Sequence, residues 1–202
     1  MAKLVDAYGS GPYAARHGSS TLPSPTVALA KAGSPTITLM KKQKIIPIIF
    51  DTYIAVIKNS VGSKMFRNSY AKVKGKKKDI LRNGKISCAF FVSSILALFP
   101  LFKLIKYPPH ATVDGTIRDL EQSGWQKITK PKIGSIIVWE KIDFGNKNFH
   151  KHIGFYIGNN KAISTNSFKK GQPAVHHWTY GIKRNKPGRK VEAIFWNKKL
   201  NQ

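Results

Sequence analysis

Cys88 is the only cysteine in the 202-residue sequence, and six histidines accompany it. A single cysteine cannot close an internal disulfide, and it cannot supply the paired cysteines of a structural zinc site. Cys88 is therefore either a buried core side chain or a nucleophile. A thiol becomes nucleophilic when it loses its proton, which a helix amino terminus and a neighbouring imidazolium both favour. The corresponding chemistry is covalent attack by Cys88 with a histidine as base.

The residues around Cys88 predict the start of a buried helix. Asn83-Gly84 is a turn signal, and Ser87 is a residue type that caps helices. The apolar stretch after Cys88 is too short for a membrane span of about 20 residues, and Pro100 interrupts it. We expect Cys88 in the first helical turn, where the helix dipole would lower its pKa.

The rest of the chain predicts helices first and strands afterwards. Apolar residues at helical spacing predict an amphipathic helix over 50–70, followed by a basic turn, and Thr112–Trp125 has the pattern of a capped helix ended by Ser123-Gly124. Short β-branched and aromatic runs then predict antiparallel strands at 132–140, 152–158, 161–165 and 191–196. Gly158-Asn-Asn-Lys161 fits a tight hairpin. This order indicates an α+β fold.

The base that Cys88 needs must be brought close by the fold. His152 begins one of the predicted strands and is the best candidate among the histidines. An imidazole acts as a base only when a third polar group holds it in the right tautomer. The sequence therefore predicts a cysteine–histidine pair with an orienting residue.

Three segments, in their order along the chain, resemble the NlpC family of cell-wall cysteine peptidases and, more distantly, the CHAP amidases, both papain-like. They are Ser87-Cys88-Ala-Phe-Phe-Val-Ser93, Lys130-Pro-Lys-Ile-Gly-Ser-Ile-Ile-Val-Trp139 and His152-Ile-Gly-Phe-Tyr-Ile-Gly-Asn-Asn-Lys161. The resemblance implies a papain-like α+β domain over residues 40–202. Its amino-terminal helices would pack on a small antiparallel sheet, with the nucleophilic cysteine at a helix start.

The resemblance also implies where the orienting residue lies. The family usually has a histidine on the second hairpin strand, at the position that Ser164 occupies here. Asn166 lies two residues further on the same strand face, and its amide oxygen can accept from an imidazole. We favour Asn166 and keep Ser164 as the alternative, with His176 and His177 also open.

The family's reaction implies hydrolysis of an amide bond in a peptidoglycan stem peptide. Cys88 would attack the carbonyl, His152 would protonate the leaving amine, and water would release the acyl group. Backbone N–H groups near Cys88 would hold the oxyanion. No cofactor is needed. Ser87 and Ser135 stand where the family has acidic residues, so an inactive member that only binds wall peptides is one alternative.

The histidines also invite a metal interpretation, which we do not favour. His150 and His152 share one strand face, and His176-His177 follows later. Neither carboxylates nor further cysteines accompany them, as zinc would require. His176 or His177 would instead line the substrate groove or cap a loop.

The composition is strongly basic, with 35 Lys and Arg against 9 Asp and Glu and a formal net charge of +26. Such a surface attracts polyanions without specificity, including anionic cell-wall polymers. Runs such as 74–78 and 183–190 are typical of solvated loops. A basic polyanion- or nucleic-acid-binding protein is the alternative from another functional class, although no nucleic-acid-binding motif occurs in the sequence.

Residues 1–39 differ from the rest of the chain. More than half are Ala, Gly, Ser, Thr or Pro without periodicity, which predicts disorder. They also resemble the translation of a transfer-RNA gene, so we expect the genuine start at Met40. The apolar block 45–50 is shorter than the roughly 7–15 residues of a signal-peptide core. No stable membrane insertion is expected, and the cellular location stays open between the cytoplasm and an unrecognised export route.

Overall fold

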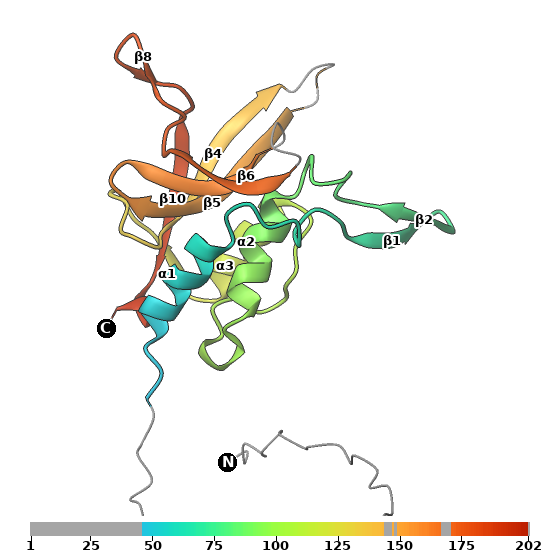
Figure 1. The fold of residues 1–202 in the computed structure, drawn as a ribbon, viewed down its shortest axis with the longest axis horizontal. Coiled ribbons are helices and arrows are strands. Elements are labelled where there is room, and N and C mark those ends of the chain that lie inside the picture. Colours follow the sequence, from blue (N-terminus) through green and yellow to red (C-terminus); the bar gives the residue numbers. More distant parts are fainter. Residues whose placement is uncertain (1–45, 144–146, 148, 167–170, 202) are drawn as a thin grey trace, which may run out of the picture. The chain divides into compact units, whose positions relative to one another are not determined.

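The computed structural model describes residues 46–143, 147, 149–166 and 171–201, with the backbone alone at Asn166 (Figure 1). The predictions of disorder over 1–39 and of a start at Met40 lie outside these residues. Within these residues, three α-helices precede the main sheet: α1 (Ile49–Asn59), α2 (Cys88–Ala97) and α3 (Val113–Gln122). Short 3₁₀ helices lie at Pro100–Phe102 and Lys198–Leu200.

A six-stranded antiparallel sheet follows the helices, with the strand order β3-β10-β4-β5-β6-β7. Its strands are β3 (Trp125–Lys127), β4 (Ile136–Asp143), β5 (Phe149–Gly158), β6 (Lys161–Asn166), β7 (Gln172–His177) and β10 (Val191–Asn197). Two separate hairpins are formed by β1 (Tyr70–Val73) with β2 (Lys76–Asp79), and by β8 (Ile182–Lys183) with β9 (Lys186–Pro187). The predicted α+β class with antiparallel strands is confirmed.

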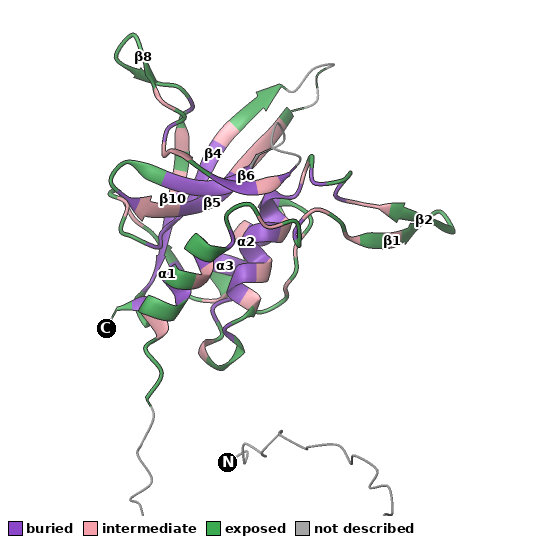
Figure 2. Ribbon diagram, in the orientation of Figure 1, coloured by how far each residue is buried: buried purple, intermediate pink, exposed green. Residues whose placement is uncertain are grey.

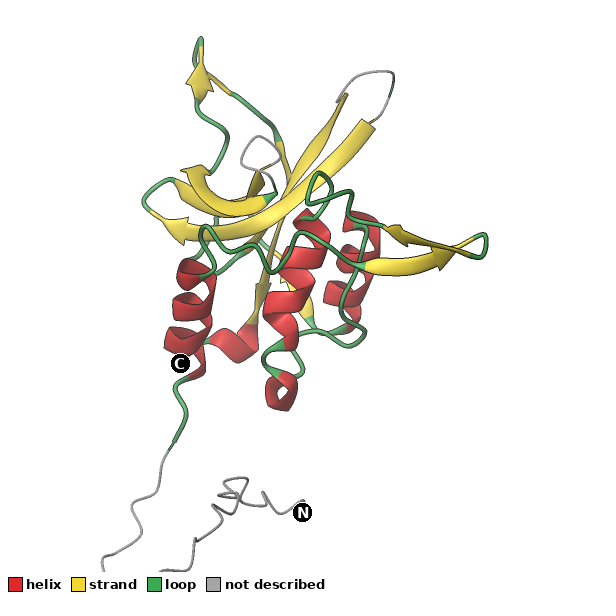
Figure 3. Ribbon diagram, turned by 45° about the vertical axis from the view of Figure 1, so that its right-hand side comes forward, coloured by secondary structure: helices red, strands yellow, loops and turns green. Residues whose placement is uncertain are grey.

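The helices pack on one face of the sheet (Figures 2 and 3). The two faces of the sheet carry different sets of buried side chains. Ile153 and Phe155 of β5 face the core with α1 and α2. Trp139 of β4 belongs to a smaller cluster together with Ile137 and Ala162. Because side chains alternate along a strand, His152 falls on the same face of β5 as Gly154, opposite to Ile153.

Two of the three predicted helices are confirmed. Helix α2 begins at Cys88 and is largely buried, and α3 is capped by Thr112, whose Oγ1 accepts from the Gly115 N–H at 3.1 Å. Gly124, with a φ of 85°, follows the end of α3. No helix among the described residues is long and apolar enough to cross a membrane.

The predicted helix over 50–70 is wrong in its second half. Helix α1 ends at Asn59, and Gly62 adopts a φ of 78°, which L side chains avoid. Phe66 nevertheless packs into the core from the segment that follows. The expected basic turn is the exposed β1–β2 hairpin, which Asp79 anchors by accepting from the Ser69, Leu81 and Asn83 N–H groups.

The predicted hairpin at 158–161 is confirmed, and it places the two strands that matter most for the site. Gly158 pairs with Lys161, and both central residues, Asn159 and Asn160, have positive φ, as a tight hairpin requires. The strand predicted at 132–140 begins at Ile136 and continues to Asp143. Strands β3 and β7 were not predicted.

Candidate active site

Cys88 lies at the start of α2, as predicted. The Ser87 carbonyl accepts the first helical hydrogen bond, from the Phe91 N–H at 2.8 Å. The Ser87 hydroxyl does not cap the helix, because it donates instead to the Gly84 carbonyl at 3.0 Å. The turn over 83–84 thus fixes the residue before the thiol, and Cys88 itself is 8% exposed.

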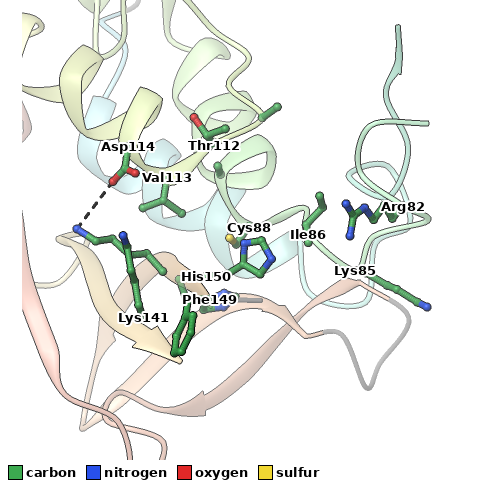
Figure 4. Close-up of a pocket in the computed structure, with 14 residues that line it drawn as sticks. Arg82, Lys85, Ile86, Cys88, Thr112, Val113, Asp114, Lys141, Phe149 and His150 are labelled. Atoms are coloured by element: carbon green, nitrogen blue, oxygen red, sulfur yellow. Dashed lines mark ion pairs between the residues drawn. The ribbon is translucent and has the colours of Figure 1, made fainter. Parts of the chain in front are cut away.

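Cys88 opens onto a cavity of about 590 Å³ between the start of α2, the start of α3 and the first residues of β5. Figure 4 shows the sulfur on the helix side of the cavity, with Phe149 and His150 on the strand side. His152 lines the same cavity. The structure therefore brings the predicted nucleophile and the predicted base to one site.

Side chains from the two strands next to β5 hold His152 in place. Its Nε2 lies 2.9 Å from the Oγ of Ser164, which is 1% exposed. Its ring packs on that of Trp139, the residue of β4 with which it pairs, with 5.6 Å between the ring centroids. A Cβ at Gly154 would lie 2.7 Å from the Ser164 Cβ and 2.6 Å from the Ile163 carbonyl oxygen. Glycine there is what lets β6 approach His152.

The contact continues past Ser164 to strand β7. The Ser164 Oγ lies 2.7 Å from Nε2 of His176 and 3.2 Å from the Tyr180 hydroxyl. His176 Nδ1 lies 2.8 Å from the His177 carbonyl oxygen. The rings of His176 and Tyr180 stack with centroids 4.3 Å apart. A chain of hydrogen bonds thus runs from His152 through Ser164 to His176.

The other two candidates for the orienting residue are Asn166 and His177. The side chain of Asn166 lies outside the described residues, and its backbone pairs with Gln172 at the far end of β6. His177 caps a loop, one of the two roles foreseen for it. Its Nδ1 accepts from the Thr179 N–H and the Gly181 N–H, each at 3.2 Å. Ser164 is the predicted alternative that contacts His152.

The pKa of Cys88 is raised, contrary to the sequence-based expectation. Burial is the largest cause, and the backbone N–H groups of Ile153 and Ala89 and the charge of Arg189 only partly oppose it. Burial, followed by the charges of Arg189 and His176, lowers the pKa of His152 to about 3. At neutral pH the two groups are therefore a neutral thiol and a neutral imidazole, rather than an ion pair.

Arg189 is a buried cation beside this site that sequence reasoning missed. It is 6% exposed, and it donates to the Glu140 carbonyl at 2.7 Å and to the His150 carbonyl at 3.2 Å. Its guanidinium also lies 5.7 Å from the centre of the Tyr180 ring. Arg189 belongs to the basic run 183–190, whose composition indicated only a solvated loop.

The histidine pairs do not gather further ligands. Among the residues that the structure describes, no three His, Cys, Asp or Glu side chains converge as metal ligands would. His152 and His176, which lie on different strands, instead meet at the Ser164 hydroxyl.

A scan of the sequence against models of protein families finds no match, and a search of curated proteins finds none either.

Proposed function

We propose that the protein is a papain-like cysteine hydrolase that cleaves an amide bond of peptidoglycan stem peptides. Cys88 is the nucleophile, His152 the base and Ser164 the orienting residue. The observation that carries the proposal is the pairing of His152 Nε2 with Ser164 Oγ at 2.9 Å, beside a cavity that Cys88 and His152 both line. The resemblance of three segments to the NlpC family supports the substrate class.

The neutral state of the pair determines how the reaction begins. Cys88 loses its proton to His152 as the sulfur attacks the carbonyl carbon, because the resting thiol is protonated. Since Nε2 of His152 faces Ser164, Nδ1 is the nitrogen that accepts this proton and later gives it to the leaving amine. The first N–H groups of α2 have no intrahelical acceptor, so they can stabilise the oxyanion. Water then hydrolyses the thioester.

The cavity walls favour an anionic peptide. Arg82 and Lys85 line one end and Lys141 lines the other, with Cys88 between them (Figure 4). The cavity also contains one carboxylate, Asp114, which is paired with Lys151 at 3.8 Å. The net positive charge attracts a peptide that carries free carboxylates on either side of the scissile bond.

The test is hydrolysis of purified peptidoglycan fragments, followed by mass spectrometry of the products. We expect a new free amine from the wild type, none from Cys88→Ala, and a loss of roughly 10²–10⁴-fold in His152→Gln. His150→Gln is the matched control, because His150 lines the same cavity from the same strand. Retained activity in Cys88→Ala, or a larger loss in His150→Gln than in His152→Gln, contradicts the assignment.

A second candidate function rests on the β1–β2 hairpin, which carries lysines on both strands. Lys72 lies directly opposite Lys77, and both are exposed. Like charges across a strand pair are destabilising, so a polyanion that neutralises them would be bound favourably. A mobility shift of a nucleic acid that disappears at moderate salt and in Lys72→Ser/Lys77→Ser, without any hydrolysis of wall peptides, would favour this function over the first.

A further inference from the structure

We propose that His176 is a positioning residue that fixes the direction of the hydrogen bonds running to His152, and so selects the tautomer of His152 that can act as a base. The inference deepens the proposed function and rests on it. It starts from three contacts in line: His152 with Ser164, Ser164 with His176, and His176 with the His177 carbonyl.

The direction of these hydrogen bonds is set at the end furthest from His152, where His176 contacts the His177 carbonyl. A carbonyl oxygen only accepts hydrogen bonds, so the 2.8 Å contact with the His177 carbonyl requires a proton on Nδ1 of His176. Burial is the main reason that the pKa of His176 is lowered, which keeps the ring neutral. A neutral imidazole carries a single proton, so Nε2 of His176 is bare and acts as an acceptor.

Ser164 passes this direction on. Its hydroxyl has one proton, which it donates to the bare Nε2 of His176 at 2.7 Å. Its oxygen can then only accept from its other neighbours. Tyr180 can donate to it at 3.2 Å, because burial raises the pKa of Tyr180 to about 12 and its hydroxyl keeps its proton. The remaining lone pair accepts from Nε2 of His152 at 2.9 Å.

His152 is thereby left with one possible tautomer. Its Nε2 must carry the proton that Ser164 accepts, and its Nδ1 is then bare. A bare Nδ1 is what general-base transfer from the Cys88 thiol needs. Without His176, the Ser164 hydroxyl could rotate and donate to Nε2 of His152. The proton would then sit on Nδ1, and the ring could not accept the proton of Cys88.

The tautomers can be read directly from the imidazole ¹⁵N resonances of the folded wild-type protein at neutral pH, because protonated and bare ring nitrogens give separate signals. We expect a proton on Nδ1 of His176 and on Nε2 of His152. The opposite tautomer at either histidine would overturn the proposal. This measurement needs no substrate, so it stands or falls independently of the hydrolytic activity.

Two variants separate the role of the acceptor from the role of the ring. His176→Gln can place an amide oxygen where Nε2 lies, whereas His176→Phe keeps a ring against Tyr180 but has no acceptor. We expect His152 to keep its tautomer in His176→Gln and to show a mixture in His176→Phe. The kcat should fall about 10-fold or more in His176→Phe with little change in KM, approaching the roughly 10²–10⁴-fold contribution of a general base.

Each combination of results has one meaning. An unchanged His152 tautomer in a folded His176→Phe contradicts the proposal, whatever the activity. If the wild type shows the expected tautomers but hydrolyses no wall peptide, the positioning role stands and the substrate class fails. If His176→Phe does not fold, the wild-type tautomers and the comparison with His176→Gln still decide the question.

Discussion

The half-buried, neutral imidazole of His152 should make the stability of the protein depend on pH in a way that one substitution removes. In the folded protein the pKa of His152 is about 3, whereas an unfolded chain has the ordinary value of 6.5. Below pH 6.5 the unfolded state therefore binds a proton that the folded state does not bind. The stability due to neutral His152 is fully present above pH 6.5 and is lost progressively as the pH falls towards 3.

The size of this effect follows from linkage. One pKa unit corresponds to about 1.4 kcal/mol, so His152 should lower the free energy of unfolding by roughly 2–3 kcal/mol between pH 7 and pH 4.5. The full gap down to pH 3 corresponds to about 5 kcal/mol, which is a large part of the 5–15 kcal/mol stability of a typical domain.

The assay is urea unfolding of the wild type and of His152→Gln at pH 7, 5.5 and 4.5. Glutamine keeps an N–H donor for Ser164 but does not titrate, so the comparison isolates the imidazole. Carboxylates that also destabilise the protein at low pH, such as Asp119, are common to both proteins and cancel in the difference. We expect the wild type to lose roughly 2–3 kcal/mol more than His152→Gln between pH 7 and 4.5.

Parallel stability curves for the two proteins would refute the reasoning. They would mean that His152 titrates at its ordinary pKa in the folded protein, and hence that the ring is solvated rather than enclosed by Trp139 and Ser164. The resting pair with Cys88 would then be free to form an imidazolium–thiolate pair.

Three further outcomes follow from the same structure. Gly154→Ala should cost roughly 1–3 kcal/mol in urea unfolding, because its methyl group would overlap Ile163 and Ser164, and it should slow hydrolysis about 100-fold by displacing Ser164. Burial raises the pKa of Asp119, but hydrogen bonds from an imidazole, two backbone N–H groups and a hydroxyl outweigh burial and lower the pKa. Asp119→Asn should therefore lower the free energy of unfolding by about 2–3 kcal/mol at pH 7. The loss should become smaller as the pH falls through the pKa of Asp119. Alkylation of Cys88 should accelerate only above the ordinary thiol range near ~8.5, and a midpoint below 7 would contradict the raised pKa.

The fold was predictable where local pattern and packing agree. The start of α2 and the hairpin after β5 carry turn residues whose backbone preferences leave few alternatives. The helix over 50–70 was overextended because Phe66 continues the apolar spacing of α1, although it packs into the core from a non-helical segment. Strand β7 was missed because Pro173 argues against a strand interior. The sheet tolerates Pro173 because β7 is an edge strand.

For the candidate site, the sequence predicted the positions of only those residues whose local segments are distinctive. Cys88 and His152 each sit in a recognisable element, and the cavity joins them. Strand parity could not choose between Ser164 and Asn166, since both project to one face of β6. Arg189 could not be found from sequence, because nothing in a basic run distinguishes the one cation that folds inwards.

Whether Ser164 can orient His152 depends on the neighbouring strand β7. A lone hydroxyl is a weak orienter, because it can donate or accept with equal ease. Against β7 it loses that freedom, since the bare nitrogen of His176 takes its only proton. Ser164, hydrogen-bonded to His176, can then supply the acceptor for His152 that a histidine at this position usually supplies in the NlpC family. Whether position 164 supports catalysis is therefore decided by His176, on the strand that local sequence patterns did not predict.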